Sequence, residues 1–139
     1  MTRFLLVEDD DDHAELIGRL FRQRHPEIDL LRVSDGAEAL AYLRGPDRHP
    51  KPPSLVLLDL NLPLVSGLEV LKEMKADNDL TLVPIVMLTS SDSSDDVQEA
   101  YRNHVNSYLV KPGELVGFRS LVDSVVEYWT QWNLNPELA

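Results

Sequence analysis

Five short apolar runs, separated by stretches with helical spacing, constrain the fold of this 139-residue chain more than any other feature. The runs are RFLLV (3–7), IDLLRV (28–33), SLVLLDL (54–60), VPIVMLT (83–89) and NSYLV (106–110). The third and fourth are apolar throughout, as expected of strands covered on both faces. Five alternating strand and helix units predict an α/β fold, a doubly wound parallel sheet with helices on both faces.

The last predicted helix has the clearest apolar stripe. Its members are Leu115, Phe118, Leu121, Val122, Val125, Val126 and Trp129. They recur at the three- and four-residue spacing of one helix face. We therefore expect this helix to pack its stripe against the sheet.

Composition excludes several classes of protein. The chain carries 24 acidic residues against 13 Lys and Arg, so it lacks the basic face of a nucleic-acid binder. It has no cysteine, which removes disulfides, thiolate zinc sites and cysteine nucleophiles. No apolar run approaches the ~20 residues of a membrane span, and the N-terminus lacks a signal-peptide pattern. We expect a soluble cytoplasmic protein that binds neither nucleic acid nor membrane.

An acidic cluster directly follows the first apolar run. Glu8 and Asp9 end that predicted strand, and Asp10–Asp12 continue the run of carboxylates. Each pair of charges about 4 Å apart costs roughly 4 kcal/mol at an effective dielectric near 20. A bound cation explains such a cluster, and solubility or a helix start is the alternative. Asp10–Asp12 fit a helix start, where negative charge meets the positive helix end.

Polar residues also stand at the ends of the third, fourth and fifth predicted strands. Asp59 ends the third strand, Thr89 the fourth and Lys111 the fifth. Because ligands of parallel sheets bind at the carboxyl ends of the strands, we expect these side chains to converge with Glu8 and Asp9. Carboxylate oxygens suit Mg²⁺. A calcium-binding EF-hand loop starting at Asp9 is excluded, since its sixth position needs glycine and is alanine here.

Four segments resemble those that mark response-regulator receiver domains, in the same order: LLVEDD, LVLLDLNLPLVSG, PIVMLTS and YLVKP. Thr89 and Lys111 follow Asp59 by 30 and 52 residues, which is typical of that family. The resemblance covers about residues 3–130. It implies a CheY-like, flavodoxin-like receiver fold with five helices and strand order 2-1-3-4-5. We assign residues 1–130 to the receiver domain and 131–139 to a C-terminal tail.

Three further features resemble the stand-alone response regulators of bacterial phytochrome histidine kinases. They are the loop RGPDRHPKPPS, the segment HVNSYLVKPGEL and the aromatic end VVEYW. Many of those proteins carry serine after the lysine, whereas Pro112 stands here. The resemblance implies two-component signalling with a sensor histidine kinase, a phytochrome, as partner. No sequence remains for an output domain, so we expect output through another protein or through self-association.

The receiver resemblance also implies how the site works. Asp59 would be phosphorylated from a kinase phosphohistidine, and the protein would catalyse only its own phosphorylation and dephosphorylation. Mg²⁺ would be bound by Asp9, Asp59 and the backbone carbonyl of Asn61, with Glu8 acting through water. Lys111 would contact a phosphoryl oxygen.

Other roles follow from the same resemblance. Thr89 would bind a second phosphoryl oxygen, and Tyr108 would be the aromatic switch residue that fills the space Thr89 vacates. Asn61 and Ser91 stand where receivers tune dephosphorylation. The Lys111–Pro112 bond would be cis, as in most of the family.

Two alternatives remain open. A haloacid-dehalogenase-like phosphatase also uses Asp, Ser or Thr, and Lys with Mg²⁺, but it needs a second Asp where Asn61 stands. A pseudo-receiver would be a binding module that no longer takes phosphate. The four histidines, at positions 13, 25, 49 and 104, show no ligand spacing, so we expect them to be surface residues.

The aromatic C-terminal segment predicts a homodimer through the last helix and the tail. Beyond the stripe, the segment YWTQWNLNPEL adds Tyr128, Trp129, Trp132, Leu134 and Leu138. A domain of this size has already covered its sheet, so these residues have little core left to enter. Large exposed apolar groups mark interfaces, and Trp and Tyr are favoured anchors there. The alternative is a tail that folds back on its own last helix.

Overall fold

The computed structural model describes residues 1–136 and confirms the five-stranded parallel sheet. The strands are β1 (Thr2–Val7), β2 (Ile28–Val33), β3 (Leu55–Leu58), β4 (Ile85–Thr89) and β5 (Ser107–Val110). Their order in the sheet is β2-β1-β3-β4-β5, as the receiver resemblance implies. The fully buried sequences of β3 and β4 place these two strands inside the sheet, since both faces are covered there.

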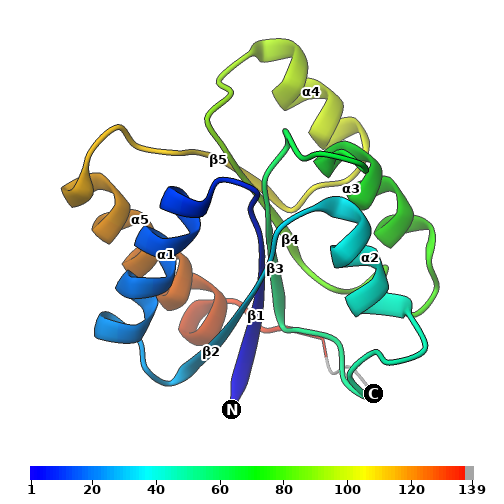
Figure 1. Ribbon diagram of the computed structural model, residues 1–139, viewed down its shortest axis with the longest axis horizontal. Coiled ribbons are helices and arrows are strands. Elements are labelled where there is room, and N and C mark those ends of the chain that lie inside the picture. The colour runs from blue at the N-terminus through cyan, green and yellow to red at the C-terminus, as the bar shows by residue number, and fades with distance from the viewer. Residues whose placement is uncertain (137–139) are drawn as a thin grey trace.

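Helices cover both faces of the sheet (Figure 1). They are α1 (Asp11–Arg24), α2 (Gly36–Arg44), α3 (Gly67–Ala76), α4 (Ser94–Arg102) and α5 (Leu115–Glu127). Helices α1 and α5 bury Ile17, Phe21, Phe118 and other apolar residues against one face. Helices α2, α3 and α4 do the same against the other face, with Met74 and Ala100 among the buried residues. The two faces therefore form two separate hydrophobic clusters.

Strand register brings the acidic residues to one edge. Val7 of β1 pairs with Leu58 of β3, so Glu8 and Asp59 follow neighbouring residues in the sheet. On the other side of β4, Thr89 pairs with Val110, which directly precedes Lys111. The polar residues at the strand ends are thus level with one another, as the α/β pattern predicts.

The last helix differs from the prediction at both ends. Leu115 was placed on the buried stripe, but it lies in the first turn of α5 and is 48% exposed. At the other end, Tyr128–Trp132 continue α5 as a π-helix. Trp129 is buried in the core beside α5, as the apolar stripe predicts, so the second expectation, that it lies with the exposed residues of the tail, was wrong. Trp129 follows Val125 by four residues and so still lies on the buried face of the last helix.

The described part of the tail folds back beneath the sheet. The amide of Asn135 donates to the backbone carbonyl of Trp129 at 3.2 Å. Asn135 and Pro136 lie beside Pro52 and Pro84, at the amino ends of the strands (Figure 1). Leu138 lies outside the described residues. Asn135 thus ties the described part of the tail to its own last helix, while Trp132 and Leu134 stay exposed.

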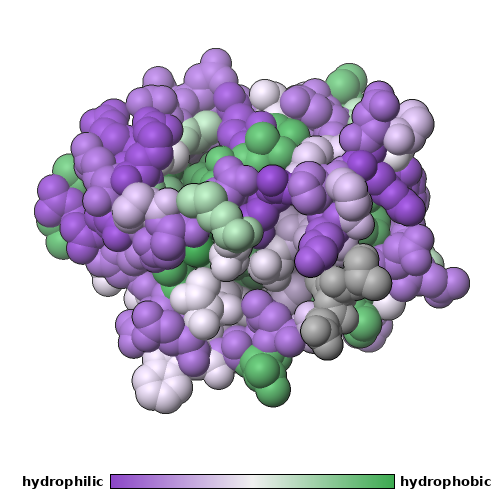
Figure 2. Space-filling model, turned by 90° about the horizontal axis from the view of Figure 1, so that it is seen from below, coloured by the Kyte–Doolittle hydropathy of each residue, from purple (hydrophilic) through white to green (hydrophobic). Residues whose placement is uncertain are grey.

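The N-terminus lies at the end of the molecule opposite the acidic strand ends (Figure 1). Figure 2 shows that this face is mainly hydrophilic, with hydrophobic residues in small patches. Within residues 1–136, no helix has both the length and the apolar character needed to cross a membrane.

Candidate functional site

Lys111 is the centre of a buried ion cluster at the carboxyl ends of β1, β3 and β5. Its Nζ lies 2.8 Å from Oε2 of Glu8 and 2.9 Å from Oδ2 of Asp59. Its side chain is only 4% exposed, and those of Glu8 and Asp59 are 1% and 7% exposed. The backbone N–H of Lys111 donates to the carbonyl of Thr89 at 2.8 Å, which fixes the start of the side chain. The structure therefore brings together three residues that are far apart in sequence.

The acidic residues could hold a divalent cation. One carboxylate oxygen from each of Glu8, Asp9 and Asp59 lies within 4.8 Å of the other two. Oε2 of Glu8 is already ion-paired with the ammonium of Lys111 at 2.8 Å, so a cation would share this carboxylate with Lys111. Hard cations prefer carboxylate oxygens. The donor set therefore fits the Mg²⁺ site expected from sequence.

The loop after β1 is held from both sides. Asp10 caps α1, and its Oδ1 accepts from the backbone N–H groups of Asp12 and His13 at 2.9 and 3.0 Å. The first turn of α1 therefore explains Asp10–Asp12, as predicted. Arg32 of β2, which sequence analysis did not single out, donates to the carbonyl of Glu8 at 2.9 Å and to the carboxylate of Asp11 at 2.9 Å.

Burial changes the protonation of the cluster. Burial, followed by the neighbouring Asp59 carboxyl, raises the pKa of Glu8 to about 7, although Lys111 acts in the opposite direction. Burial alone would lower the pKa of Lys111, but its bonds to Glu8 and Asp59 raise that pKa overall. Lys111 therefore stays charged, while Glu8 takes up a proton near neutral pH.

Replacing Glu8 by glutamine is expected to stabilise the metal-free protein at about pH 8 and to do so much less near pH 5.5. A raised pKa contributes stability that is present below the unfolded-state value and is lost as pH rises through about 7. The amide removes the buried negative charge and so avoids that loss. Thermal melting of both proteins with a chelator across this pH range checks the prediction. The same difference in melting temperature between the two proteins at every pH would contradict it.

Thr89 and Tyr108 lie at the same edge of the sheet. Thr89 is fully buried, and its Oγ1 accepts from the N–H of Ser91 at 3.4 Å. Tyr108 is partly buried, and its hydroxyl donates to the carbonyl of Ser91 at 2.9 Å. Burial raises the pKa of Tyr108. Asn61 is joined to the site through its backbone N–H, which donates to Oδ1 of Asp59 at 3.2 Å.

The predicted cis bond between Lys111 and Pro112 is not present, because no peptide bond among residues 1–136 is cis. The trans form is the intrinsically favoured isomer. The Lys111 ammonium reaches both carboxylates from this trans backbone. The resemblance therefore pointed to the wrong isomer but to the right place for the ammonium.

Two histidines are only partly exposed and make contacts that the sequence did not suggest. Nδ1 of His13 lies 3.0 Å from Nζ of Lys111, so this ring borders the ion cluster. Nε2 of His25 lies 2.7 Å from Asp123 and links α1 to α5. Arg24 and then His25 hold the pKa of Asp123 down to about 2, against the effect of burial. The position of His13 in the turn after the acidic run was the signal that could have identified it.

Comparison with known proteins decides the family. The response regulator receiver domain model matches residues 4–123. The chain belongs to the response regulator receiver domain family. This receiver is 46% identical to the probable methanogenesis regulatory protein FilR2 of Methanothrix harundinacea, over 95% of this chain and 86% of FilR2. It is 37% identical to response regulator Rcp1 of Synechocystis sp., over 91% of this chain and 88% of Rcp1.

Solved structures give the same result. The receiver matches the phosphorylated cyanobacterial phytochrome response regulator RcpA with a TM-score of 0.91 and 36% identity, covering 98% of this chain and 99% of RcpA. It matches the Mn²⁺-bound form of Rcp1 with a TM-score of 0.87 and 34% identity, covering 99% of this chain and all of that one. The phytochrome response regulators are thus among its relatives, as the sequence features indicated.

Proposed function

We propose that this response regulator accepts a phosphoryl group on Asp59 from a sensor histidine kinase. The observation that carries the proposal is the position of the Asp59 carboxylate, which lies 2.9 Å from the buried Lys111 ammonium and within the acidic cluster with Glu8 and Asp9. A nucleophilic carboxylate beside a fixed cation suits phosphoryl transfer, where catalysis is mainly positioning and charge neutralisation.

The transfer forms one bond and breaks one. A carboxylate oxygen of Asp59 attacks phosphorus, and the bond from phosphorus to the kinase histidine nitrogen breaks. The leaving imidazole nitrogen keeps the electron pair of that bond, and the product on Asp59 is an acyl phosphate. Lys111 balances charge on the transferred oxygens as a compact, fixed cation. The hydroxyl of Thr89 would bind another of these oxygens.

Glu8, Asp9, Asp59 and the backbone carbonyl of Asn61 are the groups that would hold a divalent cation. When bound, such a cation supplies positive charge that offsets the crowded carboxylates and the incoming phosphoryl oxygens. Rcp1 has been solved with Mn²⁺, and the receiver domain of the histidine kinase PA1611, at 25% identity, with magnesium in its active-site cleft. We infer that Mg²⁺ is the working ion here.

Replacing Asp9 by alanine should abolish Mg²⁺-dependent labelling without lowering the melting temperature of the metal-free protein. The variant loses a metal ligand, and it also relieves like-charge repulsion with Glu8 and Asp59. Mg²⁺ titration and labelling by acetyl phosphate measure the first effect, and melting with a chelator the second. Asp12→Ala, in the first turn of α1, is the matched control. A Mg²⁺ affinity equal to that of the wild type would contradict this role.

Switching would use Thr89 and Tyr108. A phosphoryl group adds charge and acceptor oxygens that the Thr89 hydroxyl can bind. Movement of Thr89 toward Asp59 opens space near β5, and Tyr108 would exchange its bond to Ser91 for that space. The surface of α4, β5 and α5 would change as a result.

The relatives point to two kinds of sensor kinase as the partner. RcpA is described as a phytochrome response regulator, and Rcp1 is similar to this chain, which favours a phytochrome kinase acting in the cytoplasm. FilR2 is named for methanogenesis, which favours a kinase with another input. Phosphotransfer profiling against all histidine kinases of the source organism, at short times, distinguishes the two; fastest labelling by a kinase without a phytochrome module would exclude the first.

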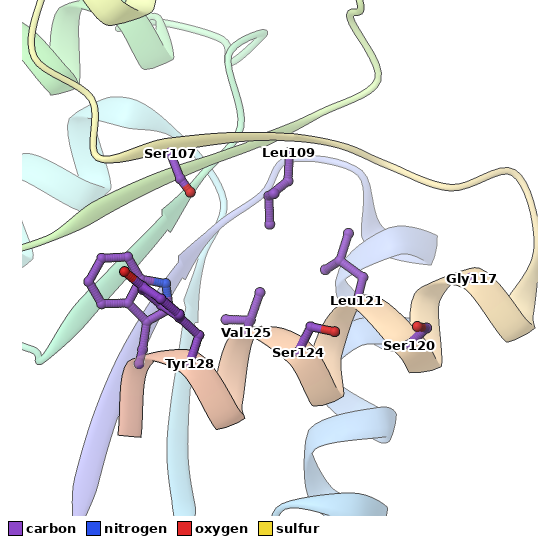
Figure 3. Close-up of a pocket in the computed structure, with 9 residues that line it drawn as sticks. Ser107, Leu109, Gly117, Ser120, Leu121, Ser124, Val125 and Tyr128 are labelled. Atoms are coloured by element: carbon purple, nitrogen blue, oxygen red, sulfur yellow. The ribbon is translucent and has the colours of Figure 1, made fainter. Parts of the chain in front are cut away.

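We further propose a homodimer through α5 and the tail. Tyr128, Trp132 and Leu134 are 52%, 74% and 96% exposed, although all three are large apolar side chains. Tyr128 also borders a groove between β5 and α5 that is lined by Leu109, Val125 and other residues (Figure 3). A hollow with apolar walls beside exposed aromatic residues has the composition of an interface.

Replacing Trp132 and Leu134 together by serine is expected to convert a dimer into a monomer. Both side chains are exposed, so the fold is kept, whereas removal of Trp129 would damage the core. Light scattering over a concentration series measures the oligomeric state, with Leu82→Ser as an exposed control on another surface. A wild-type monomer at ~100 μM would defeat the proposal, since a weaker interface is worth less than about 5.5 kcal/mol.

A further inference from the structure

His13 contacts the ion cluster at Lys111, and it is not one of the groups that would hold the metal. Nδ1 of His13 lies 3.0 Å from Nζ of Lys111. An ammonium group has only donors, so this nitrogen must accept with its lone pair. The contact therefore requires the tautomer that carries its ring proton on Nε2, and the same Nδ1 also lies 3.7 Å from Oδ2 of Asp10. Lys111 thus has three close partners, the two carboxylates of Glu8 and Asp59 and this ring nitrogen.

The backbone and the ring of His13 are each held by a neighbouring residue. Its backbone N–H is bonded to the capping carboxylate of Asp10 at 3.0 Å, which sets the first turn of α1. Its ring packs against Phe118 of α5, with 6.1 Å between ring centroids and an angle of 41° between the planes. The side chain is 35% exposed, so its outer edge reaches solvent while Nδ1 faces Lys111.

We propose that His13 is a positioning residue for phosphoryl transfer, holding the Lys111 ammonium in place beside Asp59. The inference rests on the proposed phosphorylation of Asp59 and deepens it. A lysine ammonium on a flexible four-carbon stem can move between two neighbouring carboxylates. A third acceptor on a rigid ring fixes its position. An imidazole nitrogen that accepts this bond carries no proton, so it adds no charge to a site that already holds three carboxylates.

The test compares an alanine and an asparagine variant at this position. His13→Ala removes the acceptor, whereas His13→Asn keeps an oxygen acceptor near the place of Nδ1. Initial rates of labelling by acetyl phosphate are measured with saturating Mg²⁺ at about pH 8, where histidine is ordinarily neutral. A small donor avoids effects on kinase docking. His49→Ala is the matched control, since the His49 ring bonds only within its own loop to Lys51.

We expect labelling of His13→Ala to be roughly tenfold slower, His13→Asn to be within about twofold of the wild type, and His49→Ala to be unchanged. Melting curves show that each variant is folded. Equal rates for His13→Ala and wild type would overturn the inference, and so would equal slowing of the alanine and asparagine variants, because that pattern indicates a purely structural role.

A spectroscopic measurement is independent of labelling. Long-range ¹H–¹⁵N spectra at about pH 8 distinguish the two neutral tautomers of histidine. The contact requires the Nε2–H form of His13 in the wild type and a weaker preference for it in Lys111→Met. An Nδ1–H form in the wild type would overturn the inference. If the wild-type protein takes no label at all, the proposed function fails, while these spectra still decide whether His13 holds Lys111.

Discussion

Replacing Lys111 by methionine is expected to lower the free energy of unfolding by about 3 kcal/mol in metal-free solution at about pH 8. The variant leaves Glu8 and Asp59 buried, close together and without their shared cation. Breaking a buried ion pair by removing one partner costs more than the pair contributes, since the remaining charge stays desolvated. Denaturant unfolding of both proteins measures the difference.

Two conditions should reduce the loss caused by Lys111→Met. Mg²⁺ should restore much of the stability, because its charge offsets the same carboxylates. Lower pH should do the same, since Glu8 already takes up a proton near pH 7. Lys72→Met on the exposed side of α3 is the control. The variant should still accept phosphate, but more slowly and with poor switching. Unchanged stability at about pH 8 would show that the cluster is not held by this ammonium.

Replacing Gly67 by alanine is expected to destabilise the fold by about 3 kcal/mol and to slow labelling of Asp59 strongly. A methyl group on Gly67 would lie 2.0 Å from the backbone carbonyl oxygen of Asp59 and 2.8 Å from Cα of Leu60. Neither backbone group can rotate away, so the loop that carries the phosphorylation site must shift. Misplacement by about 1 Å can cost a hundredfold in rate.

Gly113→Ala is the matched control for Gly67→Ala. Gly113 has no neighbouring atom within 4 Å of an added methyl group, and its φ is not positive. Its stability and labelling should stay close to those of the wild type. Denaturant unfolding and acetyl phosphate labelling measure both variants. If Gly67→Ala behaves like Gly113→Ala, the close packing of α3 on the Asp59 loop does not position the site.

The sheet and the centre of the site were predictable because both follow from the alternation of apolar runs with helical stretches along the chain. The apolar run LVLL ends at Asp59, and the parallel register places Glu8 beside it. Lys111 could be added because the fifth strand ends directly before it. In each case the end of a strand fixes where the backbone of the next residue lies. The end of a strand can be recognised in a single sequence as the last residue of an apolar run.

The features that sequence analysis missed depend on contacts between distant elements. Arg32 and His13 reach the cluster through side chains whose direction no periodicity reveals. Tyr128–Trp132 continue the last helix as a π-turn, which no regular 3.6-residue pattern predicts. The trans bond before Pro112 depends on a difference of only about 0.5–1 kcal/mol between isomers, which a motif does not resolve.

Intact-protein mass spectrometry, followed by peptide mapping after acetyl phosphate treatment with Mg²⁺, tests the central proposal most directly. We predict the addition of one phosphoryl group on the peptide that contains Asp59 and none on Asp59→Asn or without Mg²⁺. The substitution keeps the shape of the side chain but removes the nucleophilic carboxylate. Full labelling of Asp59→Asn, or no labelling of the wild type by either acetyl phosphate or any histidine kinase, would contradict the account.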